Sequence, residues 1–274
     1  MSIKFSIMFS ITRIILINSL FVYLFPPTLF AQGESIFEKE ITAGEYRIFL
    51  TNNENDFFTG SIQIADKYNN TVFYTDSIYS RYNWDTLIDL NNDGSKELLL
   101  NLGTGATMYD YNMYLIFDFK NKSFEPFEIH NAELVTNVDD IPKIISYVRM
   151  SPAVMGAGYT FSLKYDGNKI ILENDISKSK VLKSLDPLES DEFDFIRQYE
   201  EGFDECENDS EVKIYYEAYL TQQMILGQEE KGWKFFEKHY KCKNKKSMRA
   251  ELKKTIEENY KYLRNADYKI QTLN

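Results

Sequence analysis

The chain has 274 residues, of which 43% are hydrophobic and 15% aromatic, and its formal net charge at pH 7 is −11. This length allows one large or two ordinary domains. A strongly acidic surface repels nucleic acid, so the composition excludes nucleic acid as an expected partner.

The first 31 residues have the pattern of a secretory signal peptide. They contain no acidic residue, carry Lys4 and Arg13, and are apolar from Ile14 to Phe25, before two prolines and a terminal Ala31. The alternative is a membrane anchor, but the apolar run is shorter than the ~20 residues that a spanning helix needs. We therefore expect cleavage after Ala31 and export to the periplasm or out of the cell. The mature chain is not expected to span a membrane.

Residues 32–183 alternate polar and apolar side chains over short runs that are joined by turns rich in Asn and Gly. Such alternation indicates half-buried strands, and such turns favour hairpins between them. The sequence predicts an antiparallel β-rich domain, arranged as a partial propeller or a sandwich-like stack. The ten expected strands are Glu45–Thr51, Phe57–Ala65, Thr71–Thr75, Trp84–Asp89, Glu97–Leu102, Asn112–Phe119, Ser123–Ile129, Lys143–Val148, Tyr159–Tyr165 and Lys169–Glu173.

Residues 184–274 carry apolar side chains at helical spacing, which predicts a helical domain. Asp186, Pro187 and Glu189 supply an N-cap acceptor, a proline at the first helical position and an acid at the third, so a helix is expected to start there. Further helices are expected at about 211–226, at about 228–240 and from Ser247 onward. The predicted fold class is therefore α+β, with a β-rich body followed by helices.

The chain holds two cysteines, Cys206 and Cys242, which flank the expected helices at 211–226 and 228–240. An antiparallel hairpin of these helices would bring its open ends together. Because export permits disulfide formation, we predict a Cys206–Cys242 disulfide, with two free buried thiols as the alternative. Two cysteines without nearby paired histidines do not indicate a zinc site.

The most informative stretch is Asp89–Glu97, a candidate calcium loop. Asp89, Asn91, Asp93 and Glu97 stand at loop positions one, three, five and nine, and the backbone carbonyl of Ser95 is available at seven. Calcium prefers such oxygen ligands, and glycine at residue 94 permits the positive φ that a tight loop needs. An EF-hand is excluded because Leu100 stands where its bidentate Glu belongs. The alternative is a polar hairpin turn without metal.

The stretch Leu87–Leu100, followed by a Gly-rich turn and the strand Tyr114–Phe117, resembles one FG-GAP/VCBS repeat of the integrin-α type. The resemblance covers about residues 84–119. It implies a Ca²⁺ loop between two strands of a propeller blade, in a domain that serves adhesion, recognition or scaffolding outside the cell.

Signals for catalysis are weak. The two histidines, His130 and His239, lie in no metal motif, and no Gly-x-Ser-x-Gly elbow occurs. No catalytic residue is therefore predicted. The expected function is an exported, calcium-binding, non-catalytic binding or structural module whose partner is an extracellular or envelope protein or a glycan. The alternative is an extracytoplasmic hydrolase acting on glycans or peptides.

Overall fold

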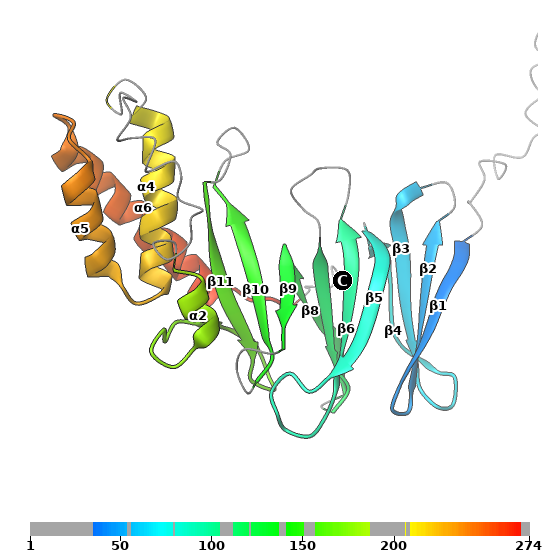
Figure 1. Ribbon diagram of the computed structural model, residues 1–274. Helices are drawn as coiled ribbons and strands as arrows, with labels where there is room; N and C mark the ends of the chain where they lie inside the picture. The colour runs from blue at the N-terminus through cyan, green and yellow to red at the C-terminus, as the bar shows by residue number, and fades with distance from the viewer. Residues whose placement is uncertain are drawn as a thin grey trace, which may run out of the picture.

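The computed structural model describes residues 35–53, 56–78, 80–104, 112–120, 122–136, 141–150, 157–186, 206 and 209–269. Within these ranges the chain forms three antiparallel sheets followed by helices (Figure 1). The predicted α+β class is confirmed. The predicted signal peptide at 1–31 and nearly all of the helix predicted from Asp186 lie outside the described residues.

Each sheet is a meander of four consecutive strands. The first sheet contains β1 (Ser35–Ala43), β2 (Tyr46–Asn53), β3 (Asp56–Ala65) and β4 (Thr71–Ile78). The middle sheet contains β5 (Ser80–Ile88), β6 (Glu97–Thr104), β7 (Met113–Asp118) and β8 (Ser123–His130). The third sheet contains β9 (Ala132–Val135), β10 (Lys143–Arg149), β11 (Gly158–Tyr165) and β12 (Ile170–Glu173).

The middle sheet is buried on both faces. On β6, Leu98 and Leu100 pack into a core shared with the first sheet, whereas Leu99 packs into a second core shared with the third sheet. Successive side chains of a strand point to opposite faces. The uninterrupted leucine run of β6 therefore follows from its position between two other sheets, and Figure 1 shows the three sheets side by side.

The helices are α2 (Lys180–Ser184), α4 (Asp209–Ile225), α5 (Glu229–His239) and α6 (Lys245–Asn265). The last three share a core and lie beyond the third sheet (Figure 1). Gln222 on α4 joins them to β11, because its side chain accepts a hydrogen bond from Thr160 N at 2.7 Å and donates one to Thr160 O at 2.8 Å. Strand β12 pairs with β11 only from Ser162 onward. Gln222 thus supplies the backbone hydrogen bonds that a longer β12 would have supplied.

After α6 the chain returns to the middle sheet. Lys269 forms an isolated antiparallel bridge with Phe127 of β8, and Glu128 N donates to Tyr268 O at 2.7 Å. Because β8 is the last strand of its sheet, this C-terminal segment covers part of an edge that would otherwise present unpaired backbone groups.

All ten predicted strands are confirmed, with ends that differ by a few residues. The strands β1 and β9 were not predicted. The short helix α2 was not predicted: it begins inside the range predicted to be strand-rich, 32–183, and ends one residue beyond it. The helices predicted at 211–226, at 228–240 and from Ser247 correspond to α4, α5 and α6.

Candidate metal-binding loop

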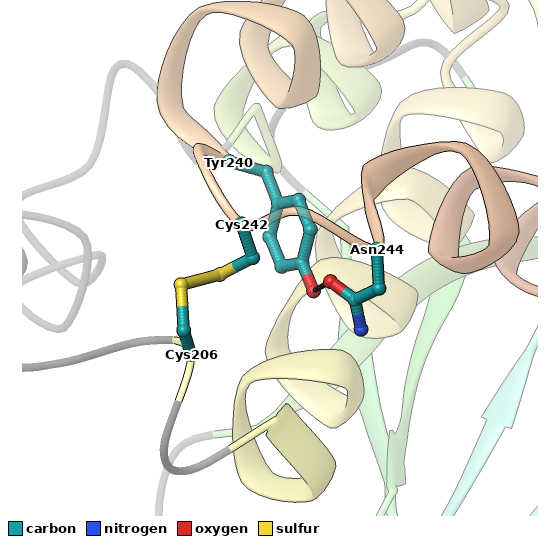
Figure 2. The surroundings of a disulfide bond; sticks show 4 residues. All are labelled: Cys206, Tyr240, Cys242 and Asn244. Atoms are coloured by element: carbon teal, nitrogen blue, oxygen red, sulfur yellow. Dashed lines mark hydrogen bonds between the residues drawn. A yellow bond between two sulfur atoms is a disulfide. The ribbon is translucent and has the colours of Figure 1, made fainter.

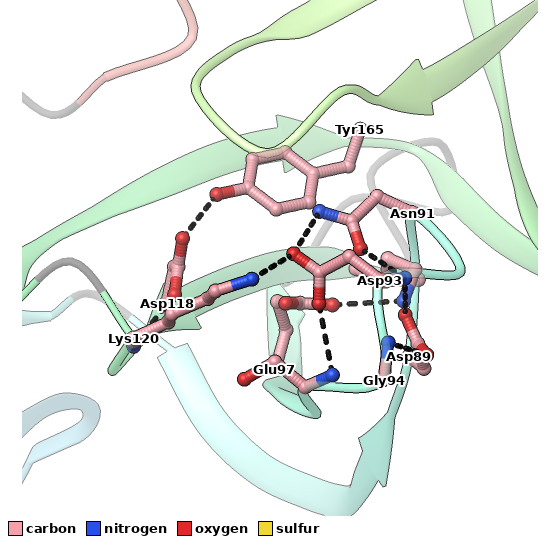
Figure 3. Close-up of polar contacts among 10 residues, drawn as sticks. Asp89, Asn91, Asp93, Gly94, Glu97, Asp118, Lys120 and Tyr165 are labelled. Atoms are coloured by element: carbon pink, nitrogen blue, oxygen red, sulfur yellow. Dashed lines mark hydrogen bonds and ion pairs between the residues drawn. The ribbon is translucent and has the colours of Figure 1, made fainter.

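The candidate loop connects β5 to β6 at one end of the middle sheet (Figure 3). Leu90 is 1% exposed and packs into the core between the middle and third sheets, so the loop is anchored from inside. Asn92 and Gly94 adopt positive φ angles of 60° and 83°. The expected positive φ at Gly94 is confirmed, and a side chain there would strain the backbone.

Three predicted ligands converge on the amides of the loop itself. Asp89 accepts from Asp93 N through Oδ1 at 3.0 Å and from Gly94 N through Oδ2 at 2.8 Å. Asn91 Oδ1 also accepts from Asp93 N, at 3.1 Å. Asp93 Oδ1 accepts from Ser95 N at 2.8 Å. The structure therefore brings Asp89, Asn91 and Asp93 together around a tight turn whose backbone N–H groups they satisfy.

Glu97 lies at the start of β6 and is 1% exposed. Its Oε2 accepts a hydrogen bond from Leu90 N at 2.8 Å across the base of the loop. Burial raises the pKa of Glu97 to about 7. The hydrogen bond from Leu90 N lowers this pKa, and the neighbouring carboxylates of Asp118 and Asp93 raise it by less than burial does. A cation near this carboxyl group would favour its ionised form.

A positive charge already contacts the loop. Lys120 Nζ donates to Asp93 Oδ2 at 2.8 Å (Figure 3). This contact lowers the pKa of Asp93 and raises the pKa of Lys120. The backbone of Lys120 is held in turn, because Lys120 N donates to Asp118 Oδ1 at 2.8 Å. The turn after β7 thus carries an ammonium group to the side of the loop.

The loop also meets the third sheet. Tyr165 on β11 donates its buried hydroxyl to Asp118 Oδ2 at 2.6 Å. At Gly167, which has a φ of 95°, an added Cβ would lie 3.0 Å from the Asn91 side chain. The loop is therefore placed where the middle sheet contacts the β11–β12 turn, and it touches residues on both sides of that boundary.

The donor set fits calcium in its chemistry: Asp89 and Asp93 supply carboxylates, Asn91 an amide oxygen, Ser95 a backbone carbonyl and Glu97 a further carboxylate. Their arrangement is that of a turn, because Asp89 and Asp93 accept hydrogen bonds from the backbone amides of the loop itself. Among the described residues no group of three or more His, Cys, Asp or Glu side chains is placed to hold a metal. Glu97 in particular is directed at Leu90 N. The predicted calcium site therefore stays a prediction.

A groove of about 540 Å³ lies elsewhere, where β8, β10 and the C-terminal segment meet. His130 at the end of β8 contacts Glu128 at 2.5 Å, and Asp267 accepts from Lys269 N at 3.1 Å. The hydroxyl of Tyr268 is buried without a hydrogen-bond partner among the described residues. The aromatic and charged residues that line the groove include Glu128, His130, Tyr147, Arg149, Tyr262, Asp267, Tyr268 and Lys269.

The groove and the loop lie toward opposite ends of the middle sheet. Along β7, Phe117 pairs with Leu98 beside the loop, whereas Met113 pairs with His130 beside the groove. The groove was not found from the sequence, because its lining comes from segments far apart in the chain, which the fold alone brings together.

The predicted disulfide is confirmed. Cys206 and Cys242 are bonded, with a Cα–Cα distance of 5.5 Å (Figure 2). Next to it Tyr240 donates its hydroxyl to Asn244 Oδ1 at 2.8 Å, across the turn between α5 and α6. Cys242 packs into the helical core, so the bond fixes Cys206, which precedes α4 in the chain, to that core.

Comparison of the chain with protein-family models, with curated proteins and with solved structures gave no match in any of the three. The resemblance to FG-GAP/VCBS repeats therefore rests on the quoted residues alone. Within the described ranges, no helix is both long enough and apolar enough to cross a membrane.

Proposed function

We propose that the protein is an exported, non-catalytic binding or structural module whose β-rich body is stabilised by Ca²⁺ at the loop Asp89–Glu97. The observation that carries the proposal is the location of the loop: oxygen donors at alternate positions gather where the middle sheet meets the third sheet. An ion bound there would stabilise the folded state because the unfolded chain does not hold these donors together.

The residues that would hold the ion are Asp89, Asn91, Asp93 and Ser95 through its carbonyl, with Glu97 behind them. A bound Ca²⁺ supplies positive charge to a group of carboxylates that the fold holds close together. Glu97 would then stay ionised at neutral pH despite its burial. Asn91, which contacts the β11–β12 turn at Gly167, would transmit the ordering of the loop to the third sheet.

Export is supported by two independent features. Residues 1–31 have the charge and hydropathy pattern of a signal peptide. The second feature is the Cys206–Cys242 disulfide, because disulfides are typical of proteins outside the cytoplasm.

The surface proposed to bind a partner is the groove between β8, β10 and the C-terminal segment. Its volume is in the range of ligand sites, and its tyrosines suit an exported protein or glycan as partner, since tyrosine combines apolar area with a polar tip. A second candidate function is an extracytoplasmic hydrolase acting on glycans or peptides. It is favoured by the presence of two carboxylates, Glu128 and Asp267, in the same groove.

The test is isothermal titration calorimetry of Ca²⁺ into the wild type, Asp93→Ala and a control, Asp66→Ala. Asp66 is a partly exposed aspartate in the β3–β4 turn, where Tyr68 N and Asn70 N donate to it at 2.9 and 2.8 Å. The proposal predicts saturable binding by the wild type and by Asp66→Ala, and none by Asp93→Ala. Absence of binding by the wild type, or equal binding by all three proteins, would contradict it.

A further inference from the structure

We propose that Lys120 is a tethered counter-ion of the loop, which competes with Ca²⁺ for Asp93 and thereby sets the calcium affinity. The inference rests on the proposed function, since it concerns the same loop. Lys120 lies outside the loop, 27 residues from Asp93 in sequence. In this proposal it determines how tightly the loop binds a cation.

The geometry places one cation where a second would have to bind. Asp93 uses Oδ1 to accept from Ser95 N at 2.8 Å. Its Oδ2 accepts from Lys120 Nζ at 2.8 Å and from Asn91 Nδ2 at 3.1 Å. A calcium ion that takes Asp93 as a ligand must therefore lie within a few ångströms of the Lys120 ammonium, and like charges at that distance repel. The ion must displace Lys120 or bind against it.

Displacement is feasible for this side chain. Lys120 is 50% exposed and Asp93 is 31% exposed, so the ammonium can move into solvent when it leaves the carboxylate. The backbone stays in place, because Lys120 N is bonded to Asp118 Oδ1. Lysine is a compact point charge on a flexible stem, which suits an exchangeable partner. Without calcium the ammonium holds Asp93, and with calcium it returns to solvent.

The experiment measures Ca²⁺ affinity by titration calorimetry for the wild type, Lys120→Met, Lys120→Arg and Lys122→Met. Lys122 is an exposed lysine on the same turn, so Lys122→Met changes the net charge equally but leaves the contact with Asp93 intact. We expect Lys120→Met to bind Ca²⁺ more tightly by at least about fivefold, the lower end of coupling between linked ligands. Lys122→Met should bind less than twofold more tightly, and Lys120→Arg, which keeps the charge, should resemble the wild type.

A second measurement separates competition from a general structural role. The melting temperatures of the wild type and Lys120→Met are compared with excess chelator and with excess Ca²⁺. Competition predicts that the shift caused by Ca²⁺ is larger in Lys120→Met than in the wild type, because the loop gains an ion without losing a contact. A purely structural lysine would lower both melting temperatures equally and leave the shift unchanged.

The outcomes distinguish this inference from the proposed function. Equal affinities of the wild type and Lys120→Met would overturn the inference and leave the calcium site standing. Binding by Lys120→Met alone would support the inference and show that the ammonium replaces calcium in the natural chain. Absence of binding in every variant would overturn both.

Discussion

Replacing Glu97 by Gln tests the electrostatics of the loop. Glu97 is buried, and its pKa is raised to about 7 from the 4.5 of an exposed glutamate. One pKa unit corresponds to about 1.4 kcal/mol, so the difference amounts to roughly 3 kcal/mol of folding free energy. Because the folded-state pKa is raised, this contribution is fully present below about pH 4.5 and is lost as the pH rises through about 7.

Glutamine is neutral at every pH, and its amide oxygen can still accept from Leu90 N. We therefore expect Glu97→Gln to match the wild type near pH 4.5 and to exceed it by up to about 3 kcal/mol at pH 8, a difference that already includes the hydrogen bond from Leu90 N to the carboxylate. The assay is urea unfolding from pH 4.5 to 8 in the presence of chelator, followed by circular dichroism. Glu133→Gln, which changes an exposed glutamate on β9, is the matched control.

The informative quantity is the difference in unfolding free energy between Glu97→Gln and the wild type as a function of pH. Parallel curves for the two proteins would refute the assignment of a raised pKa to Glu97. Saturating Ca²⁺ should flatten the pH dependence of the wild type, because a nearby cation favours the ionised carboxylate. Saturating Ca²⁺ should leave the pH dependence of the unfolding free energy of Glu97→Gln unchanged.

Three further changes test the packing. Replacing Cys206 and Cys242 by Ser removes a cross-link across a sequence separation of 36 and should cost up to roughly 4 kcal/mol in the chain-entropy model; an unchanged urea midpoint would contradict it. Tyr165→Phe removes the hydroxyl that donates to the buried Asp118 at 2.6 Å and should lower the unfolding free energy by about 1–3 kcal/mol. An unchanged urea midpoint would show that this hydrogen bond does not stabilise the fold. Phe117→Ala empties a fully buried position between the first and middle sheets and should cost about 3–5 kcal/mol, so a thermal melt like that of the wild type would argue against this core.

The sequence was sufficient to predict most elements because their side-chain periodicity is local. Alternating residues marked ten strands, and Gly227, which adopts a φ of 69°, marked the turn between α4 and α5. The disulfide was also predictable, since two antiparallel helices joined by a short turn bring their open ends together. Strand β9 was missed, although β12 has the same length of four residues and was predicted. The turn residues Asp166–Asn168 mark where β12 begins.

The contacts that define the loop were not predictable in the same way. Lys120 reaches Asp93 only because β7 returns beside β6, and Tyr165 reaches Asp118 from another sheet across 47 positions of sequence. The burial of Glu97 likewise depends on the sheets on either side of β6. Such contacts depend on tertiary packing, which cannot be inferred from the spacing of residues along the chain.

The stabilisation of the folded β-rich body by calcium is tested most directly by a thermal melt of the chain without residues 1–31, in excess Ca²⁺ and in chelator. At about a hundred times the Kd, we expect ~2.7 kcal/mol of stabilisation, a shift on the order of 5–10 °C for a chain of this size. The shift should disappear in Asp93→Ala. Identical melting temperatures with Ca²⁺ and with chelator would rule out a stabilising calcium site and identify Asp89–Glu97 as a self-capped polar turn.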